Sequence, residues 1–318
     1  MSKQLKNKIV IVAMYQFVQL DDFMQMKPLL LKICGENNIK GTILLAHEGL
    51  NGTIAGSQAG IDNLLAYLHA EPRFKTMNYK KSYTNTSPFR RLKVRIKQEI
   101  VTMGMPETDP GELSGKRVDA YQWNKLIKDP DIITLDTRNV YEHEVGTFEN
   151  AISPGTYKFR DFPKFVDINL DPQKHQKIAM FCTGGIRCEK ASNYLLKNGF
   201  KEVYHLDGGI LKYLETVKKK DSLWLGECFV FDERVAVDED LMPGSYVQCH
   251  ACRRPLLASD LKSPLYETGI SCHHCYGKHG AKKIDGLKER QRQYVLESHR
   301  KTIQITMETK IKKTPNQL

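Results

Sequence analysis

The sequence lacks any long hydrophobic segment, and this absence excludes one class of protein. No run of apolar residues approaches the roughly 20 that a membrane-spanning helix needs. The first apolar stretch, residues 8–17, is interrupted by Tyr15 and Gln16, and no small-residue cleavage site follows it. We therefore expect a buried strand here rather than a signal peptide. Neither a transmembrane nor a secreted protein is expected.

Cysteines are few and unevenly spaced, which argues against a disulfide scaffold. The 318 residues include 8 cysteines; Cys34 and Cys228 stand alone, whereas the others are grouped as Cys182 with Cys188 and as two CxxC pairs, Cys249/Cys252 and Cys272/Cys275. In a reducing compartment such a pattern is typical of a catalytic thiol together with a metal site. We therefore expect a cytoplasmic protein.

Recognisable cofactor motifs are also missing. The sequence has no flavin or nicotinamide fingerprint, because Asp207-Gly208-Gly209 reads as a turn and not as GxGxxG. Histidines and carboxylates are too scattered to argue for an iron site. The residues themselves therefore predict no redox cofactor.

Acidic residues are absent from residues 73–97, in a chain whose formal net charge is +11. Aromatic residues are interleaved with the positive charges of this stretch. Lys and Arg neutralise phosphates and aromatic rings stack on unpaired bases, so the stretch predicts a single-stranded or looped RNA partner. The alternative is a solvated strand pair whose aromatics face a core. The candidate RNA-binding residues are Lys80, Lys81, Arg90, Arg91, Lys93 and Arg95.

Residues 1–105 follow the order strand, helix, strand, strand, helix, strand, which predicts a ferredoxin-like or acylphosphatase-like α+β domain. The expected strands are 8–17, 41–46, 50–55, 75–83 and 91–97, and the expected helices are 20–34 and 58–70. Between the two middle strands, His47 and Glu48 precede a Gly/Asn turn and either belong to that turn or line a site. Residues 106–118 are rich in Pro, Gly and Ser and predict a linker.

Residues 119–222 alternate helix and strand, which indicates a parallel α/β sheet. The expected helices are 119–128 and 187–198, and the expected strands 132–136, 177–181 and 202–205. Active sites of such sheets form at the carboxyl ends of the strands. The strand 177–181 ends at Cys182, which makes this cysteine the leading catalytic candidate.

The loop that follows this strand consists of Cys182, Thr183, Gly184, Gly185, Ile186 and Arg187. Its backbone N–H groups and the following helix N-terminus can converge on the sulfur and favour a thiolate or an anionic persulfide. Arg187 adds a permanent positive charge. Four residues separate Cys182 from Arg187, and cysteine phosphatases need a longer loop to wrap a phosphate. The shorter loop here suits a sulfur atom better than a phosphate group.

This loop resembles the CxxGxR active-site loop of rhodanese domains. Asp136, Arg138 and Glu142 resemble the supporting rhodanese motif, with Thr147 where histidine is commoner. Together, AHEGLNGTIAG (46–56), RNVYEHEVGTFENAI (138–152), CTGGIRCEKAS (182–192) and FVFDERVAV (229–237) resemble the bacterial TrhO family.

The TrhO resemblance implies a tRNA uridine(34) hydroxylase that forms 5-hydroxyuridine in the anticodon loop with molecular oxygen as co-substrate. It implies that Cys182 is the catalytic cysteine and Arg187 the loop arginine. Cys188 either acts as a second, resolving thiol or packs in the interior; packing is favoured, since a helix residue six positions on need not face the loop. Two rival functions stay open: a sulfurtransferase that passes persulfide sulfur from Cys182 to a small acceptor or RNA, and a non-catalytic RNA-binding adaptor.

Residues 223–318 predict a small zinc-binding segment with a basic helical tail. The two CxxC pairs are separated by 19 residues, and each pair can bind one metal from a turn, so together they complete a tetrahedral, structural zinc site. The ligands are Cys249, Cys252, Cys272 and Cys275. A helix is expected over about 285–301, followed by a frayed basic tail that either touches tRNA phosphates or is solvated.

Overall fold

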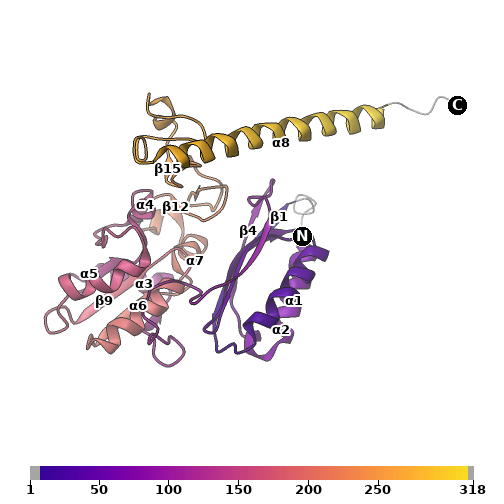
Figure 1. Ribbon diagram of the computed structural model, residues 1–318. Coiled ribbons are helices and arrows are strands. Elements are labelled where there is room, and N and C mark those ends of the chain that lie inside the picture. Colours follow the sequence, from indigo (N-terminus) through magenta and orange to yellow (C-terminus); the bar gives the residue numbers. More distant parts are fainter. Residues whose placement is uncertain (1–7, 314–318) are drawn as a thin grey trace. The chain divides into compact units, whose positions relative to one another are not determined.

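The computed structural model describes residues 8–313, which form two compact units, one ending at Gly244 and the other starting at Ser245 (Figure 1). In this described part of the chain, no helix combines the length and the apolar character that crossing a membrane requires. Each unit is considered separately below.

The first unit begins with a five-stranded sheet in the order β4-β1-β3-β2-β5. β1 is antiparallel to β3 and β4, β2 is antiparallel to β3, and β5 is parallel to β2. This confirms the predicted ferredoxin-like domain, extended by one edge strand. The bounds are β1 Ile9–Phe17, α1 Phe23–Glu36, β2 Lys40–Ala46, β3 Gly49–Gly56, α2 Gln58–Ala70, β4 Tyr79–Thr84 and β5 Leu92–Ile96.

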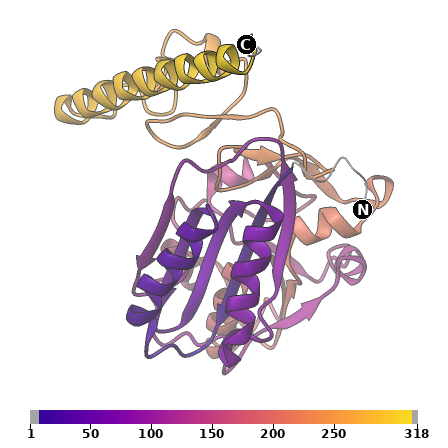
Figure 2. The ribbon, with the colours of Figure 1, turned by 90° about the vertical axis from the view of Figure 1, so that its right-hand side faces the viewer.

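Helices α1 and α2 cover one face of this sheet (Figure 2). Because side chains alternate along a strand, Val10, Val12 and Met14 of β1 pack in the core beneath the helices. Ile11 and Ala13 point to the opposite face, where they line a cavity. The apolar run at the start of β1, residues 9–14, is therefore explained by contacts on both faces of the sheet.

The second part of this unit contains a parallel sheet in the order β6-β10-β9-β7, as the alternation of helices and strands predicted. Its elements are β6 Lys116–Val118, α3 Ala120–Leu126, β7 Ile133–Asp136, α4 Val140–His143, β8 Gly146–Phe148, α5 Phe162–Asn169, β9 Lys177–Phe181, α6 Ile186–Lys197, β10 Glu202–Leu206 and α7 Gly209–Thr216. The end of the predicted linker thus forms an edge strand, and the side-chain amide of Asn193 donates to the carbonyls of Asp109 and Leu113, both at 2.8 Å.

Residues 223–244, which the sequence analysis grouped with the C-terminal cysteines, pack with this second part. β11 (Trp224–Gly226) pairs with β8, and β12 (Cys228–Phe229) pairs with β13 (Ala236–Val237). Trp224 stacks edge-on against Phe148, with ring centroids 5.1 Å apart. Aromatic contacts between distant segments, which local sequence patterns do not reveal, hold this stretch in place.

The second unit contains β14 (Val247–Gln248), β15 (Pro255–Leu256) and one long helix, α8 (Ala281–Lys313). The predicted end of this helix near residue 301 was wrong, because α8 continues to Lys313. The segment predicted as a frayed tail is therefore helical up to that residue. The sequence contains no proline between residues 281 and 313 that would stop it, and the first one, Pro315, follows two positions later. Residues 314–318 lie outside the described residues.

A buried lysine joins the two parts of the first unit. Lys190 of α6 is 1% exposed, and its Nζ lies 2.7 Å from Glu48 and 2.6 Å from Glu99. Glu48 follows β2, so the turn that contains it contacts the helix after the cysteine loop. Burial raises the pKa of Glu48, whereas Lys190 and nearby backbone amides outweigh burial at Glu99 and lower the pKa of that carboxyl.

Replacing this lysine tests how much the contact contributes to stability. Lys190→Met leaves two largely buried carboxylates without their cation, so we expect the free energy of unfolding to fall by about 2 to 3 kcal/mol. Urea unfolding measures this as a lower transition midpoint with an unchanged slope. Lys197→Met, near the exposed end of the same helix, is the control and should cost at most about 0.5 kcal/mol. Equal midpoints for the two variants would contradict this role of Lys190.

Candidate active site and metal centre

Cys182 lies at the carboxyl end of β9, as the sequence predicted, and its side chain is fully buried. The loop turns into α6 at Gly185, whose φ of 103° is a conformation that favours glycine. A Cβ at Gly185 would also lie only 2.9 Å from the hydroxyl of Tyr15. The Gly185 N–H points back and donates to the Cys182 Sγ at 3.1 Å.

The sulfur of Cys182 is surrounded by donors. Burial by itself would raise its pKa, but the Cys188 thiol, the Arg187 charge and the N–H groups of Cys188 and Gly185 outweigh burial and lower that pKa well below its ordinary value. Burial, together with the neighbouring Cys182, raises the pKa of Cys188 well above its ordinary value. Of the two cysteines, Cys182 is therefore the one whose surroundings favour a thiolate.

Cys188 is fully buried and belongs to the same apolar cluster as Cys182, so it packs in the interior beside the loop. Its N–H donates to the Gly185 carbonyl at 3.0 Å. The Cys188 Sγ also lies 3.6 Å from the Thr137 hydroxyl. A role as a second, resolving thiol stays a prediction.

Arg187 is held by Glu142 and does not point freely into the site. Its guanidinium donates to both carboxylate oxygens of Glu142, at 2.7 and 2.8 Å, and one nitrogen also lies 3.3 Å from the Thr183 hydroxyl. Glu142 in turn caps α4, accepting from the N–H of Asn139 at 3.1 Å. The motif residue Glu142 therefore fixes the loop arginine against a neighbouring helix.

Asp136 and Arg138, the other two motif residues, form a fully buried ion pair with contacts of 2.8 and 2.6 Å. Arg138 also donates to the carbonyl of Gly146 at 2.6 Å, and the Nδ1 of His143 lies 3.1 Å from Asp136. These bonds fix the turns after β7 and before β8. Asp136 and Arg138 support the loop from behind, without a hydrogen bond to Cys182 among the described residues.

The closing turn Asp207-Gly208-Gly209 packs directly against the cysteine loop. The N–H of Ile210 donates to the Cys182 carbonyl at 3.0 Å, and the N–H of Leu211 donates to the Thr183 carbonyl at 3.1 Å. A Cβ at Gly209 would lie 2.4 Å from that Cys182 carbonyl oxygen. Only glycine fits this approach, so the turn fixes the backbone of the cysteine itself.

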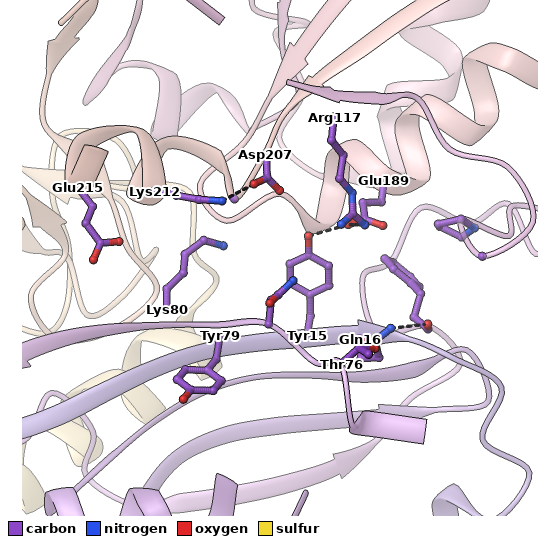
Figure 3. Close-up of a pocket in the computed structure, with 15 residues that line it drawn as sticks. Tyr15, Gln16, Thr76, Tyr79, Lys80, Arg117, Glu189, Asp207, Lys212 and Glu215 are labelled. Atoms are coloured by element: carbon purple, nitrogen blue, oxygen red, sulfur yellow. Dashed lines mark hydrogen bonds and ion pairs between the residues drawn. The ribbon is translucent and has the colours of Figure 1, made fainter. Parts of the chain in front are cut away.

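The N-terminal domain contributes residues to this site that sequence reasoning missed. Tyr15 of β1 donates its hydroxyl to Glu189 of α6 at 2.8 Å, and Arg117 donates to the same carboxylate oxygen at 2.8 Å (Figure 3). Lys80 of β4 donates to the carbonyl of Gly184, also at 2.8 Å. The one local signal was Tyr15 itself, a polar interruption in an otherwise apolar strand.

The predicted RNA-binding residues do not form a single surface. Lys80 is half-buried at the cysteine loop, Lys81 lies 3.3 Å from Asp62, and Arg90 lies 2.6 Å from Glu233. The structure places the remaining three on or near β5: Arg91 and Arg95 are exposed and Lys93 is half-buried. The RNA-binding role of all six stays a prediction.

Two cavities share Tyr15 and Lys80 as wall residues, and one of them is also lined by the cysteine loop. The first, of ≈510 Å³, lies between the open face of the N-terminal sheet and the cysteine loop, and its walls include Cys182, Ile11, Phe159 and Phe231. The second, of ≈520 Å³, is lined by charged side chains (Figure 3); these include Lys80, Arg117, Glu189, Asp207, Lys212 and Glu215. The thiolate therefore faces the more apolar of the two.

The four C-terminal cysteines come together in the second unit, where their sulfur atoms all lie within 4.8 Å of one another. Neighbouring sulfurs are 4.0 Å apart for Cys249 and Cys275, 3.7 Å for Cys252 and Cys272, and 3.8 Å for Cys272 and Cys275. A tetrahedral ion with metal–sulfur bonds of about 2.3 Å requires sulfurs about 3.8 Å apart. The cluster therefore has the dimensions of a four-thiolate site and could bind a metal such as zinc.

Comparison with known proteins agrees with this division of the chain. A family model described as the UPF0176 acylphosphatase-like domain matches residues 9–100, and a rhodanese-like domain model matches residues 119–216. Among solved structures, the chain is similar to the rhodanese-like domain of an Anabaena protein (21% identity, 30% of this chain and 71% of that chain, TM-score 0.27). It is also similar to a rhodanese-related protein from Thermoplasma volcanium (23% identity, 31% and 91%, TM-score 0.25).

The lowered pKa of Cys182 leads to a testable prediction, because the Cys188 thiol is one of its causes. Cys188→Ala removes the thiol donor, so the pKa of Cys182 should rise, whereas Cys188→Ser keeps a donor and should leave that pKa nearly unchanged. Thiolate absorbance near 240 nm, followed against pH, measures the ionisation. Each protein is compared with the same protein carrying Cys182→Ser, so that the other cysteines cancel. If the alanine and serine variants titrate alike, Cys188 is not the donor that stabilises the thiolate.

Proposed function

We propose that this protein hydroxylates the wobble uridine of tRNA, because it combines the UPF0176 acylphosphatase-like domain with a rhodanese domain, the domain architecture of the TrhO family of rhodanese-like tRNA-modifying proteins. The product is 5-hydroxyuridine, and molecular oxygen is the co-substrate. The observation that carries the proposal is a stabilised thiolate, Cys182, in the wall of a largely apolar cavity beside an RNA-compatible domain. A reactive thiol of this kind needs a reducing compartment, which favours the cytoplasm.

The cavity suits a nucleobase better than a phosphate. Its volume, ≈510 Å³, lies within the range of pockets that enclose small molecules. Arg187, whose charge lowers the pKa of Cys182, is already paired with both oxygens of Glu142. A phosphate would therefore have to compete with a buried carboxylate, whereas a flat, uncharged uracil would not. Enzymes that act on a base take it out of the stack into such a pocket.

The second thiol can supply the electrons that hydroxylation requires. Replacing the C5–H bond of uracil by C5–OH with O2 also forms one water, which takes two electrons and two protons from a reductant. Oxidation of two thiols to one disulfide releases both. Cys182 and Cys188, two buried thiols of the same cluster that affect each other's pKa, would form such a pair, and a dithiol reductant from solution would restore it after each turnover.

Sulfur transfer is the second candidate, and the loop geometry favours it to the same degree. The N–H groups that stabilise the Cys182 thiolate would also stabilise a persulfide anion on that sulfur. Oxygen dependence separates the two functions, because passing sulfur to an acceptor consumes no O2.

Nucleoside mass spectrometry of unmodified tRNA incubated with the purified protein tests the function. In air and with a dithiol reductant, we expect the wobble uridine to gain one oxygen atom, and we expect no gain without oxygen or with Cys182→Ser. Cys34→Ser is the matched control, because burial raises the pKa of Cys34 to about 12 and keeps that thiol unreactive. Cys188→Ser should lose repeated turnover if the thiol pair supplies the electrons.

Two other outcomes would contradict hydroxylation through Cys182. If no uridine is oxidised, but sulfur from labelled thiosulfate is found on Cys182, the protein is a sulfurtransferase. If Cys182→Ser retains full hydroxylation, the thiol is not catalytic.

For the second unit we propose a structural zinc ion bound by Cys249, Cys252, Cys272 and Cys275. Four thiolates close the coordination shell, so the metal would hold the two turns together and would leave no position for a substrate. Native mass spectrometry should find one zinc ion per chain. The double variant Cys249→Ser/Cys272→Ser should lose it, while Cys34→Ser/Cys228→Ser should keep it. A metal-free wild-type protein, prepared without chelators, would contradict the site.

A further inference from the structure

Lys80 connects the N-terminal domain to the cysteine loop at a single peptide group. It belongs to β4, and its ammonium group donates to the carbonyl oxygen of Gly184 at 2.8 Å. Figure 3 shows Lys80 pointing away from its sheet, beside Tyr15 and towards Lys212 and Asp207. Its Nζ also lies 6.0 Å from the centre of the Tyr15 ring.

The same peptide group carries one of the donors to the catalytic sulfur. The Gly184 carbonyl and the Gly185 N–H belong to one planar unit, in which the C=O and N–H bonds point in opposite directions. The Gly185 N–H donates to the Cys182 Sγ at 3.1 Å. A hydrogen bond that holds the oxygen on one side therefore holds the N–H on the sulfur side.

A peptide between two glycines needs such an anchor. Gly185 has a φ of 103°, and no atom lies within 4 Å of the position that a Cβ of Gly184 would occupy. Glycine visits both signs of φ with little penalty, so this peptide can rotate more easily than others in the loop. Rotation would turn the Gly184 oxygen towards an anionic sulfur and remove a donor from it.

The setting of Lys80 supports an internal role rather than contact with RNA. The side chain is half-buried, and burial lowers the pKa of Lys80 to about 8, against the opposing effects of Cys182 and Asp207. At neutral pH the group is still mostly protonated. A desolvated cation is costly to maintain, and here it both donates to a loop carbonyl and lies near the thiolate.

We propose that Lys80 is a positioning residue that locks the Gly184–Gly185 peptide with its N–H towards Cys182, so that the N-terminal domain activates the thiol of the rhodanese domain. The role is independent of whether the thiolate then serves hydroxylation or sulfur transfer. It also gives a physical reason for the fusion of the two domains in one chain.

The experiment measures Cys182 ionisation without tRNA, so its outcome is separate from that of the function assay. Thiolate absorbance near 240 nm is titrated for Lys80→Met, each time against the same protein carrying Cys182→Ser. We expect the midpoint to rise by about one pH unit, which is about tenfold less thiolate below the midpoint. Lys80→Arg keeps a donor and a charge and should recover most of the loss. Lys81→Met, the neighbouring residue paired with Asp62, should titrate as wild type.

A second readout separates peptide orientation from the loss of a charge. With glycine-selective ¹⁵N labelling, the Gly185 amide should exchange with solvent at least tenfold faster in Lys80→Met than in wild type. Loss of charge alone would shift the titration but leave this amide protected, and that result would overturn the proposal. An unchanged midpoint in Lys80→Met would overturn it too, as would a midpoint in Lys80→Arg as high as in Lys80→Met.

Discussion

An anionic sulfur inside a protein needs hydrogen-bond donors on all sides, and most of the first unit is arranged around this requirement. Cys182 is fully buried, so burial works against its thiolate, and the compensation comes from two backbone N–H groups, one thiol and one guanidinium. Each of these donors is itself held by something more distant. Glu142 fixes the guanidinium, the helix start fixes Cys188, and Lys80 bonds to the peptide of Gly185.

Helix α6 is the element on which these requirements converge. Four consecutive residues in its first turns have partners in different segments: Arg187 binds Glu142, Cys188 lowers the pKa of Cys182, Glu189 accepts from Tyr15 and Arg117, and Lys190 binds Glu48 and Glu99. All four side chains are buried, although Arg, Glu and Lys usually lie at the surface. Their burial is tolerated because each is paired, and any displacement of α6 would leave several charges unpaired at once.

The sequence predicted those features that depend on neighbouring residues. Alternating and apolar patterns identified the strands of the first sheet and three of the four strands of the second, while β6 was assigned to the linker. The segment from Cys182 to Arg187 identified the loop and its chemistry. What it did not predict depends on contacts between distant segments: Tyr15 meets Glu189 across 174 positions and Lys80 meets Gly184 across 104. No local pattern distinguishes Lys80, which binds the loop, from Lys81, which faces Asp62.

The face of the N-terminal sheet opposite α1 and α2 forms part of the cavity beside Cys182. In this sheet the apolar residues under α1 and α2 form an ordinary core, but Ile11 and Ala13 on the other side line the cavity that also contains Cys182. The same strands therefore supply a wall of this cavity and, through Tyr15 and Lys80, contacts to the start of α6 and to the cysteine loop. Moving the sheet would break these contacts, whereas a ligand that filled the cavity without moving the sheet would leave them intact. The uracil of the proposed substrate, which is flat and uncharged, would meet this constraint.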